Sequence, residues 1–150
     1  MTSTRTKENG GRFNPPGTFD VLYTSGDHIT ALAEGTRALE KAGFDPRKAF
    51  PRTTHVIEVR LSRVINLYDE KILLRLGITT EHLLGDWQAD QLAGKIAISQ
   101  KIGLIIHEET RVEGIIVPTA TKTGLFNLDI FITKKMLRSG AIKMVDPGIE

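Results

Sequence analysis

A glycine- and proline-rich stretch near the start of the chain, GGRFNPPG at positions 10–17, carries a single cation, Arg12. Glycines let a bulky anion approach the backbone, and arginine supplies a planar fork of donors. A bidentate arginine–phosphate pair is charge-assisted and contributes about 1.5–3 kcal/mol net. The stretch is therefore compatible with a pyrophosphate-binding loop. Its prolines are equally typical of a surface turn, in which Arg12 would form a weak ion pair.

The sequence lacks several signatures of established chemistry. It has no GxxxxGK[ST] or GxGxxG phosphate-binding motif and no GxSxG nucleophile motif. It also has no cysteine, which excludes disulfides, thiolate zinc sites and a thiol nucleophile. The four histidines show no metal-binding spacing, so no metal is expected. They are His28, His55, His82 and His107.

Composition indicates an ordinary globular domain. The chain has 150 residues, of which 25% are charged and 40% hydrophobic, which suits one domain with a real core. With 20 Lys and Arg against 18 Asp and Glu, the net charge of +2 is a weak indication of nucleic-acid binding. No apolar run is long enough for a signal peptide or a membrane span. We therefore expect a cytoplasmic protein that contacts neither a membrane nor nucleic acid directly.

Hydrophobic periodicity predicts the elements that must position Arg12. Asp27 is a typical N-cap for a helix that stops at Gly43, and Gly77 closes a later helix. Strands early, helices in the middle and strands late favour a single α+β domain, with mixed or antiparallel sheets and flanking helices. The expected strands are 19–25, 54–61, 64–67, 114–118, 126–132 and 141–145, and the expected helices are 28–42, 69–76, 80–84 and 87–103.

Three further expectations concern the ends and faces of these elements. The polar residues 1–9 are predicted to be flexible, so the folded domain would span 10–150. In the 28–42 helix, Ile29, Leu32, Thr36 and Leu39 fall at helical spacing and should face the core. The basic group Lys134, Lys135 and Arg138 is interpreted as a solvated face.

Three separated segments, taken together and in this order, resemble the RES domain family. They are GGRFNPPG (10–17), VLYTSGDHITALAE (21–34) and GIIVPTATKTGLFNLDIF (114–131), so the resemblance covers about residues 10–132. RES proteins are similar in fold to ADP-ribosyltransferases of the diphtheria-toxin type. Many are toxins of bacterial toxin–antitoxin pairs that degrade NAD by hydrolysis or phosphorolysis. The resemblance implies NAD as substrate and, as partner, an antitoxin with a helix-turn-helix domain.

The resemblance also implies roles for four catalytic positions. Arg12 would bind the NAD phosphates, and Tyr23 would stack on nicotinamide or its ribose. Glu34 would bind a ribose hydroxyl and stabilise the positive charge that develops as the nicotinamide bond breaks. Thr119 stands where the family has serine, so the hydroxyl is kept while the extra methyl group crowds the pocket.

A partly overlapping set of residues is expected to bind NAD. Ala31 and Ala38 lie on the same helical face as Glu34 and would leave room for a ligand. Asn127 matches a frequent family asparagine and would contact NAD or brace its loop. The expected binding residues are Gly11, Arg12, Asn14, Tyr23 and Asn127.

The same residues are compatible with two other functions. An ADP-ribosyltransferase would use the same cleft, because only the acceptor changes, from water or phosphate to a protein or nucleotide target. A non-catalytic NAD-binding module of the same fold is the other alternative, and Thr119 in place of serine motivates it. Three outcomes distinguish these functions. NAD loss indicates NAD cleavage, transfer of labelled ADP-ribose indicates a transferase, and binding without turnover indicates a binding module.

Overall fold

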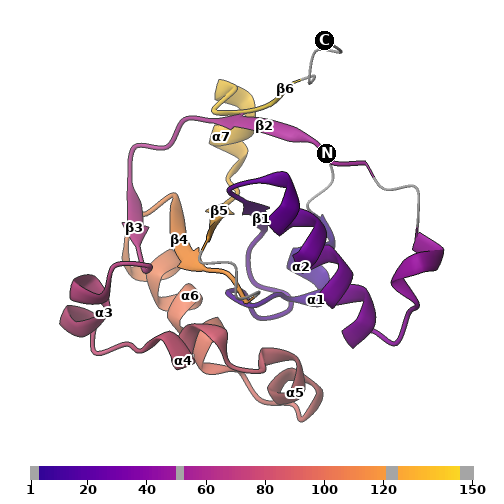
Figure 1. Cartoon of the computed structure of the whole chain (residues 1–150). Coiled ribbons are helices and arrows are strands. Elements are labelled where there is room, and N and C mark those ends of the chain that lie inside the picture. Colours follow the sequence, from indigo (N-terminus) through magenta and orange to yellow (C-terminus); the bar gives the residue numbers. More distant parts are fainter. Residues whose placement is uncertain (1–3, 50–52, 121–124, 146–150) are drawn as a thin grey trace.

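A four-stranded mixed sheet forms the centre of the protein (Figure 1) in the computed structural model, which describes residues 4–49, 53–120 and 125–145. Its strands lie in the order β1 (Val21–Ser25), β5 (Phe126–Phe131), β4 (Gly114–Pro118) and β3 (Val64–Asn66). β3 and β4 are parallel, and the other pairs are antiparallel. A separate antiparallel pair consists of β2 (Val56–Val59) and β6 (Ile142–Val145).

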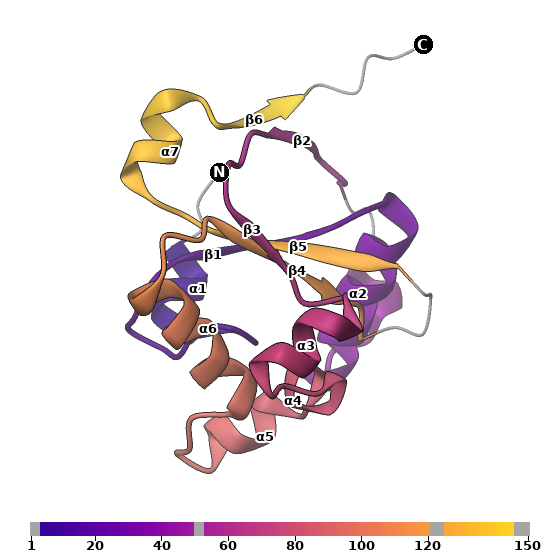
Figure 2. The same ribbon diagram turned by 90° about the vertical axis from the view of Figure 1, so that its left-hand side faces the viewer.

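Helices and the small β2–β6 sheet enclose the central sheet. In Figure 2 the central sheet crosses the middle, with the β2–β6 pair and α7 above it and α3 to α6 below it. α2 follows β1 directly and lies beside that end of the sheet. The helices are α1 (Thr4–Asn9), α2 (His28–Lys41), the 3-10 helix η1 (Pro46–Ala49), α3 (Glu70–Leu76), α4 (Thr80–Leu84), α5 (Trp87–Leu92), α6 (Ile98–Glu109) and α7 (Lys134–Ser139).

The predicted fold class, a single domain with a mixed sheet and flanking helices, is confirmed. Local signals account for much of this agreement. The Asp27 side chain accepts hydrogen bonds from the amides of Ile29 and Thr30, both at 2.9 Å, which fixes the start of α2. Gly77 ends α3 with a φ of 66°, a left-handed conformation that favours glycine.

The flexibility predicted for residues 1–9 does not extend to residues 4–9, which form α1, and residues 1–3 lie outside the described residues. The Thr6 hydroxyl donates to the carbonyl of Val21 at 3.0 Å, and the amide of Lys7 donates to the Asp20 carboxylate at 3.1 Å. These bonds attach α1 to the beginning of β1. Polar composition indicated flexibility, whereas the polar side chains of this segment form tertiary hydrogen bonds.

The single helix predicted over 87–103 is two helices. α5 ends before Gly94, whose φ of 72° turns the chain before α6 begins. The sequence analysis also missed α7, although the Thr133 hydroxyl caps its start by accepting from the amide of Met136 at 3.2 Å. The basic group on α7 is exposed, as expected for a solvated face.

The hydrophobic core lies between the central sheet and the helices below it. The predicted core face of α2 is wrong: Ile29 is 63% exposed and Leu32 is 38% exposed, while Thr30 is the buried residue of this helix. α2 borders a cleft beside the sheet instead of covering the core, so its apolar spacing does not correspond to burial. The core residues are Phe13, Phe19, Val21, Leu67, Leu73, Leu83, Ile106, Ile115, Val117 and Phe131.

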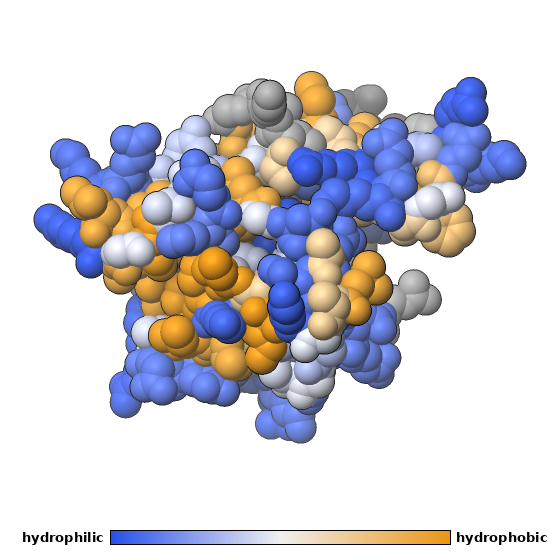
Figure 3. Space-filling model, turned by 90° about the horizontal axis from the view of Figure 1, so that it is seen from below, coloured by the Kyte–Doolittle hydropathy of each residue, from blue (hydrophilic) through white to orange (hydrophobic). Residues whose placement is uncertain are grey.

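Exposed apolar side chains gather on the lower helical face, which Figure 3 shows from below. Leu92 is the most exposed of them, at 91%, and Leu74 follows at 82%. An exposed apolar face is a typical place for contact with another chain. The members on α3, α5, α6 and the α5–α6 connection are Leu74, Leu76, Leu92, Ile96, Ile98 and Ile105.

Gly103 permits α6 to pack directly on the backbone of the glycine-rich loop, and Gly103→Ala is expected to destabilise the fold. A Cβ at this position would lie 1.9 Å from the carbonyl oxygen of Phe13. Since the obstacle is backbone, overpacking should cost about 1–3 kcal/mol or more, despite alanine's better helix propensity. Urea unfolding measures the change. Gly85→Ala is the control, because its nearest atom is the Glu81 carbonyl oxygen at 3.3 Å; an equal loss in both variants would contradict the prediction.

Candidate active site

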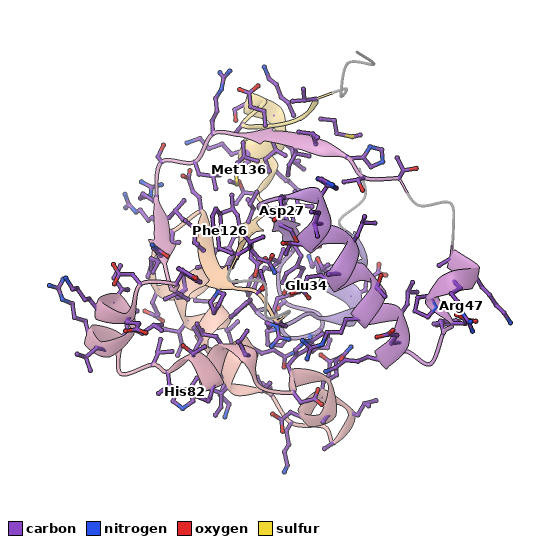
Figure 4. The ribbon with its side chains drawn as sticks, in the orientation of Figure 1. Asp27, Glu34, Arg47, His82, Phe126 and Met136 are labelled. Carbon is purple, nitrogen blue, oxygen red and sulfur yellow. The ribbon has the colours of Figure 1, made fainter. Side chains whose placement is uncertain are left out.

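A cleft of about 1000 Å³ lies between α2, the adjoining strands β1 and β5 and the glycine-rich loop. Five of its lining residues concern the chemistry: Arg12, Tyr23, Glu34, Asn127 and Asp129. Figure 4 shows Glu34 on α2 near the middle of the molecule. The volume reaches the upper end of the usual range for ligand pockets, roughly 300–1000 Å³, so the cleft has room for an elongated organic ligand.

The glycine-rich loop is shaped by contacts within the protein. Gly11 and Asn14 pair through their backbones, with the Gly11 amide donating to the Asn14 carbonyl at 2.8 Å. A Cβ on Gly11 would lie 2.5 Å from the Tyr23 hydroxyl. Glycine at position 11 therefore makes room for the Tyr23 ring, in addition to any space that it leaves for an anion in the cleft.

Arg12 extends from this loop into the cleft and is held by one end of its guanidinium. Its Nη1 donates to the carbonyls of Leu83 and Gly85, both at 3.0 Å, at the end of α4. No hydrogen bond within the described residues uses its Nε or Nη2. Burial lowers the pKa of Arg12, while Glu34 and Asp129 oppose that change. The side chain is thus a fixed cation with donors left for a ligand.

Tyr23 lines the cleft and braces the glycine-rich loop. Its hydroxyl accepts a hydrogen bond from the amide of Phe13 at 2.9 Å and donates one to Asn14 Oδ1 at 2.8 Å. Burial is the main reason that the pKa of Tyr23 is raised, and the nearby Asp129 adds to it. The hydroxyl therefore stays protonated near neutral pH.

Asn14, predicted to bind the ligand directly, lies behind the cleft surface. It is completely buried, and its Nδ2 donates to the carbonyls of Thr6 at 2.7 Å and Phe19 at 3.0 Å. Because its Oδ1 accepts the hydrogen bond from the Tyr23 hydroxyl, Asn14 supports Tyr23 from behind the cleft.

Tyr23→Phe is expected to lower the free energy of unfolding. Removal of the hydroxyl deprives the Phe13 amide and Asn14 Oδ1 of a partner, at a cost of about 1–3 kcal/mol. Chemical denaturation measures the loss. Phe44→Leu is the control, because Phe44 is 65% exposed and its substitution should cost less than about 0.5 kcal/mol. Equal stability of the Tyr23→Phe variant and the original protein would show that the brace contributes nothing.

Glu34 and Arg37 attach α2 to the segment that follows β4. Glu34 Oε1 accepts a hydrogen bond from the Ala120 amide at 3.0 Å, and Arg37 Nη1 donates to the Ala120 carbonyl. No hydrogen bond within the described part of the chain uses Glu34 Oε2. Ala31 and Ala38 line the cleft beside Glu34, as expected from their shared helical face. One oxygen of Glu34 is thus positioned by the backbone, and the other is left for a ligand.

Thr119 and Asn127, both predicted site residues, are placed differently. Thr119 is buried and is not among the residues that line the cleft, whereas its neighbours Pro118 and Ala120 are. Asn127 lines the cleft from β5. Its Oδ1 is buried and accepts no hydrogen bond from the described residues, so it suits contact with a ligand.

Asp129 is a cleft residue that the sequence analysis missed. It is 2% exposed and pairs in register with Tyr23 on β1 and Ile115 on β4. The signal was present, because the alternation of apolar and polar residues along 126–130 places Asn127 and Asp129 on one face. Burial raises the pKa of Asp129 well above its usual range; Arg12 opposes this, and Glu34 reinforces it.

The charged groups share the cleft without neutralising one another. Ion pairs within 4.0 Å among the described residues are Lys41–Asp86, Arg47–Asp45 and Arg60–Glu58. None of them joins Arg12 to Glu34 or Asp129. Arg12, Glu34 and Asp129 therefore interact electrostatically without forming an ion pair. This arrangement leaves space for a ligand between them.

Within residues 4–49, 53–120 and 125–145, no three His, Asp or Glu side chains come together in a way that could hold a metal ion. None of the helices in that part of the chain has both the length and the apolar character needed to cross a bilayer.

The fold and the cleft define a small mixed α/β domain with a candidate ligand site beside its sheet. The chain belongs to the RES domain family, whose family model matches residues 1–141. A solved structure similar in fold is described as the "Crystal structure of the M.tuberculosis MbcT-MbcA toxin-antitoxin complex". The TM-score is 0.77 at 20% sequence identity, over 97% of this chain and 74% of that one. No curated protein sequence matches the chain.

Proposed function

We propose that this chain is an NAD-consuming enzyme that cleaves the bond between nicotinamide and ribose, and that it acts as the toxin of a bacterial toxin–antitoxin pair. The observation that carries the proposal is the meeting of Arg12, Tyr23 and Glu34 in one cleft of dinucleotide size. Membership of the RES domain family supports it, as does the likeness in fold to one chain of a toxin–antitoxin complex.

Each of these residues has a role that its geometry allows. Arg12, held at Nη1, offers its remaining donors to the pyrophosphate. Tyr23 presents its ring to nicotinamide or the adjoining ribose. Glu34, fixed at Oε1 by Ala120, directs its other oxygen to a ribose hydroxyl and to the carbon that becomes positively charged.

The reaction itself needs few catalytic groups. The bond between C1′ of ribose and the pyridinium nitrogen breaks, and its electron pair leaves with nicotinamide, which becomes neutral. No general acid is needed for that leaving group, so an anion that stabilises the oxocarbenium-like centre supplies the main effect. The oxygen of water or phosphate then bonds to C1′, and water releases its proton to solvent.

Incubation of the purified protein with NAD, with and without inorganic phosphate, tests this function. We expect NAD loss and nicotinamide release in equal amounts, with ADP-ribose as product in hydrolysis and its 1″-phosphate in phosphorolysis. Incorporation of labelled ADP-ribose into a macromolecule would identify a transferase instead. NAD binding without any loss of NAD would overturn the enzymatic proposal in favour of a binding module.

We further propose that the partner of the chain is an antitoxin with a helix-turn-helix domain. The resemblance in fold to a chain from a toxin–antitoxin complex supports an antitoxin partner. Co-expression of the chain with the product of the adjacent reading frame, followed by co-purification, checks this. We expect a stable complex in which nicotinamide release is suppressed.

A further inference from the structure

Asp129 lacks the partners that a buried carboxyl group normally has. Its Oδ1 is buried and accepts no hydrogen bond from the residues that the structure describes, and the same holds for Asn127 Oδ1 two positions earlier. Buried polar atoms without partners are rare in native proteins, and each calls for a physical explanation. Since both residues line the cleft, the explanation that fits is a ligand that supplies the missing contacts.

The surroundings of Asp129 raise its pKa and so favour its neutral form. Arg12, from the glycine-rich loop, is the cation that acts on it, but Arg12 is bonded to carbonyls at the end of α4 and forms no ion pair with it. Glu34 on α2 adds a like charge, and Tyr23 on β1 is a neutral phenol. The register partner on β4 is Ile115, which cannot ionise. Burial next to a second carboxylate therefore favours the acid over the anion.

We propose that Asp129 is a ligand-binding residue of the cleft that presents a carboxylic acid O–H to an oxygen of the bound substrate. This inference rests on the proposed function, because it assumes a phosphate-bearing ligand with acceptor oxygens. The two carboxyl groups of the cleft then have different tasks. Glu34 supplies the negative charge, and Asp129 supplies a neutral donor, an arrangement that environments of unequal polarity produce in other active sites.

Charge balance favours this division of tasks. A pyrophosphate brings negative charge into a cleft where Arg12 faces Glu34 and Asp129. A second carboxylate would repel the ligand, whereas a protonated Asp129 removes that repulsion and adds a hydrogen bond. Asp129 thereby contributes to selection of an anionic ligand.

The test compares the pH dependence of ADP-ribose binding between the original protein and Asp129→Asn. Trp87, the single tryptophan, lines the cleft, so its fluorescence reports binding without any turnover. If the acid form binds, Kd in the original protein should rise above the pKa of Asp129, in the limit by about tenfold per pH unit. Asparagine keeps the shape and a donor, so its Kd should vary much less. His28 and His55 also line the cleft but are the same in both proteins, so the difference between the two profiles isolates Asp129.

Asp129→Leu provides the second variant, since leucine has no donor. It should bind ADP-ribose at least tenfold more weakly than Asp129→Asn at every pH. Identical pH profiles of the original protein and Asp129→Asn would overturn the inference, as would unchanged affinity of Asp129→Leu. Absence of ADP-ribose binding at every pH would overturn this inference alone if NAD is still consumed, and would overturn the proposed function as well if NAD is not consumed.

Stability measurements confirm that the variants fold and add a readout of protonation. Because the pKa of Asp129 is raised in the folded state, the native protein binds more protons than the unfolded chain above the ordinary Asp range. Its free energy of unfolding should therefore fall as pH rises. Asp129→Asn should lack this component and equal or exceed the original protein in stability at pH 8. A greater stability gain with rising pH in the original protein than in Asp129→Asn would contradict a protonated Asp129.

Discussion

Glu34→Gln is expected to reduce nicotinamide release about 10²–10³-fold, the range observed when one electrostatic stabiliser of a transition state is removed. Glutamine keeps the length of the side chain and an oxygen that can accept the Ala120 hydrogen bond, so the tie between α2 and the segment after β4 should survive. What disappears is the negative charge beside the developing oxocarbenium centre. The effect should fall on kcat, with little change in KM.

The control for this variant is Glu40→Gln, on an exposed position of the same helix. It removes the same charge from α2 without touching the cleft, so its rate should equal that of the original protein. Equal stability of the two variants in urea would show that the loss of rate is not a loss of fold. Nicotinamide release that is undiminished in Glu34→Gln would refute the electrostatic role of Glu34.

Short-range signals explain why many elements could be predicted from the sequence. The N-cap at Asp27, the left-handed glycine at 77 and the alternation along 126–131 each specify a local geometry through few residues. The expectations for residues 4–9 and for the core face of α2 failed because both depend on contacts between segments that are distant in the sequence. α1 is held by hydrogen bonds to the residues around β1, and α2 lies beside the sheet next to a cleft, so Ile29 and Leu32 stay exposed.

The candidate site was predictable only in part for a related reason. Arg12, Tyr23 and Glu34 were identified through a family resemblance, since no local pattern indicates that a loop, a strand and a helix meet in one cleft. The remaining predicted residues divide by position: Gly11 and Asn127 line the cleft, whereas Asn14 and Thr119 are buried and do not line it. The alternation along β5 places Asp129 on the face of Asn127, but only the register of three strands shows that Asp129 lies opposite Tyr23 and Ile115.

Arg12→Lys should weaken ADP-ribose binding about 10–100-fold, although it preserves the positive charge. Loss of a charge-assisted arginine pair corresponds to about 1.5–3 kcal/mol, and each 1.4 kcal/mol is a factor of ten in Kd. Arginine can donate to the carbonyls of Leu83 and Gly85 through Nη1 and still direct its other nitrogens to a phosphate. A lysine ammonium is a single point of contact that must choose between these tasks. Titration of Trp87 fluorescence with ADP-ribose measures the change.

The matched control is Arg47→Lys, because Arg47 lies far from Glu34 in Figure 4 and pairs with Asp45 two residues away. Its affinity for ADP-ribose should not change. The alternative to a binding role is that Arg12 only anchors the end of α4, in which case Arg12→Lys would lower the free energy of unfolding and leave Kd unaltered. Urea unfolding and binding, measured on the same preparation, therefore distinguish an arginine that recognises phosphate from one that only supports the fold.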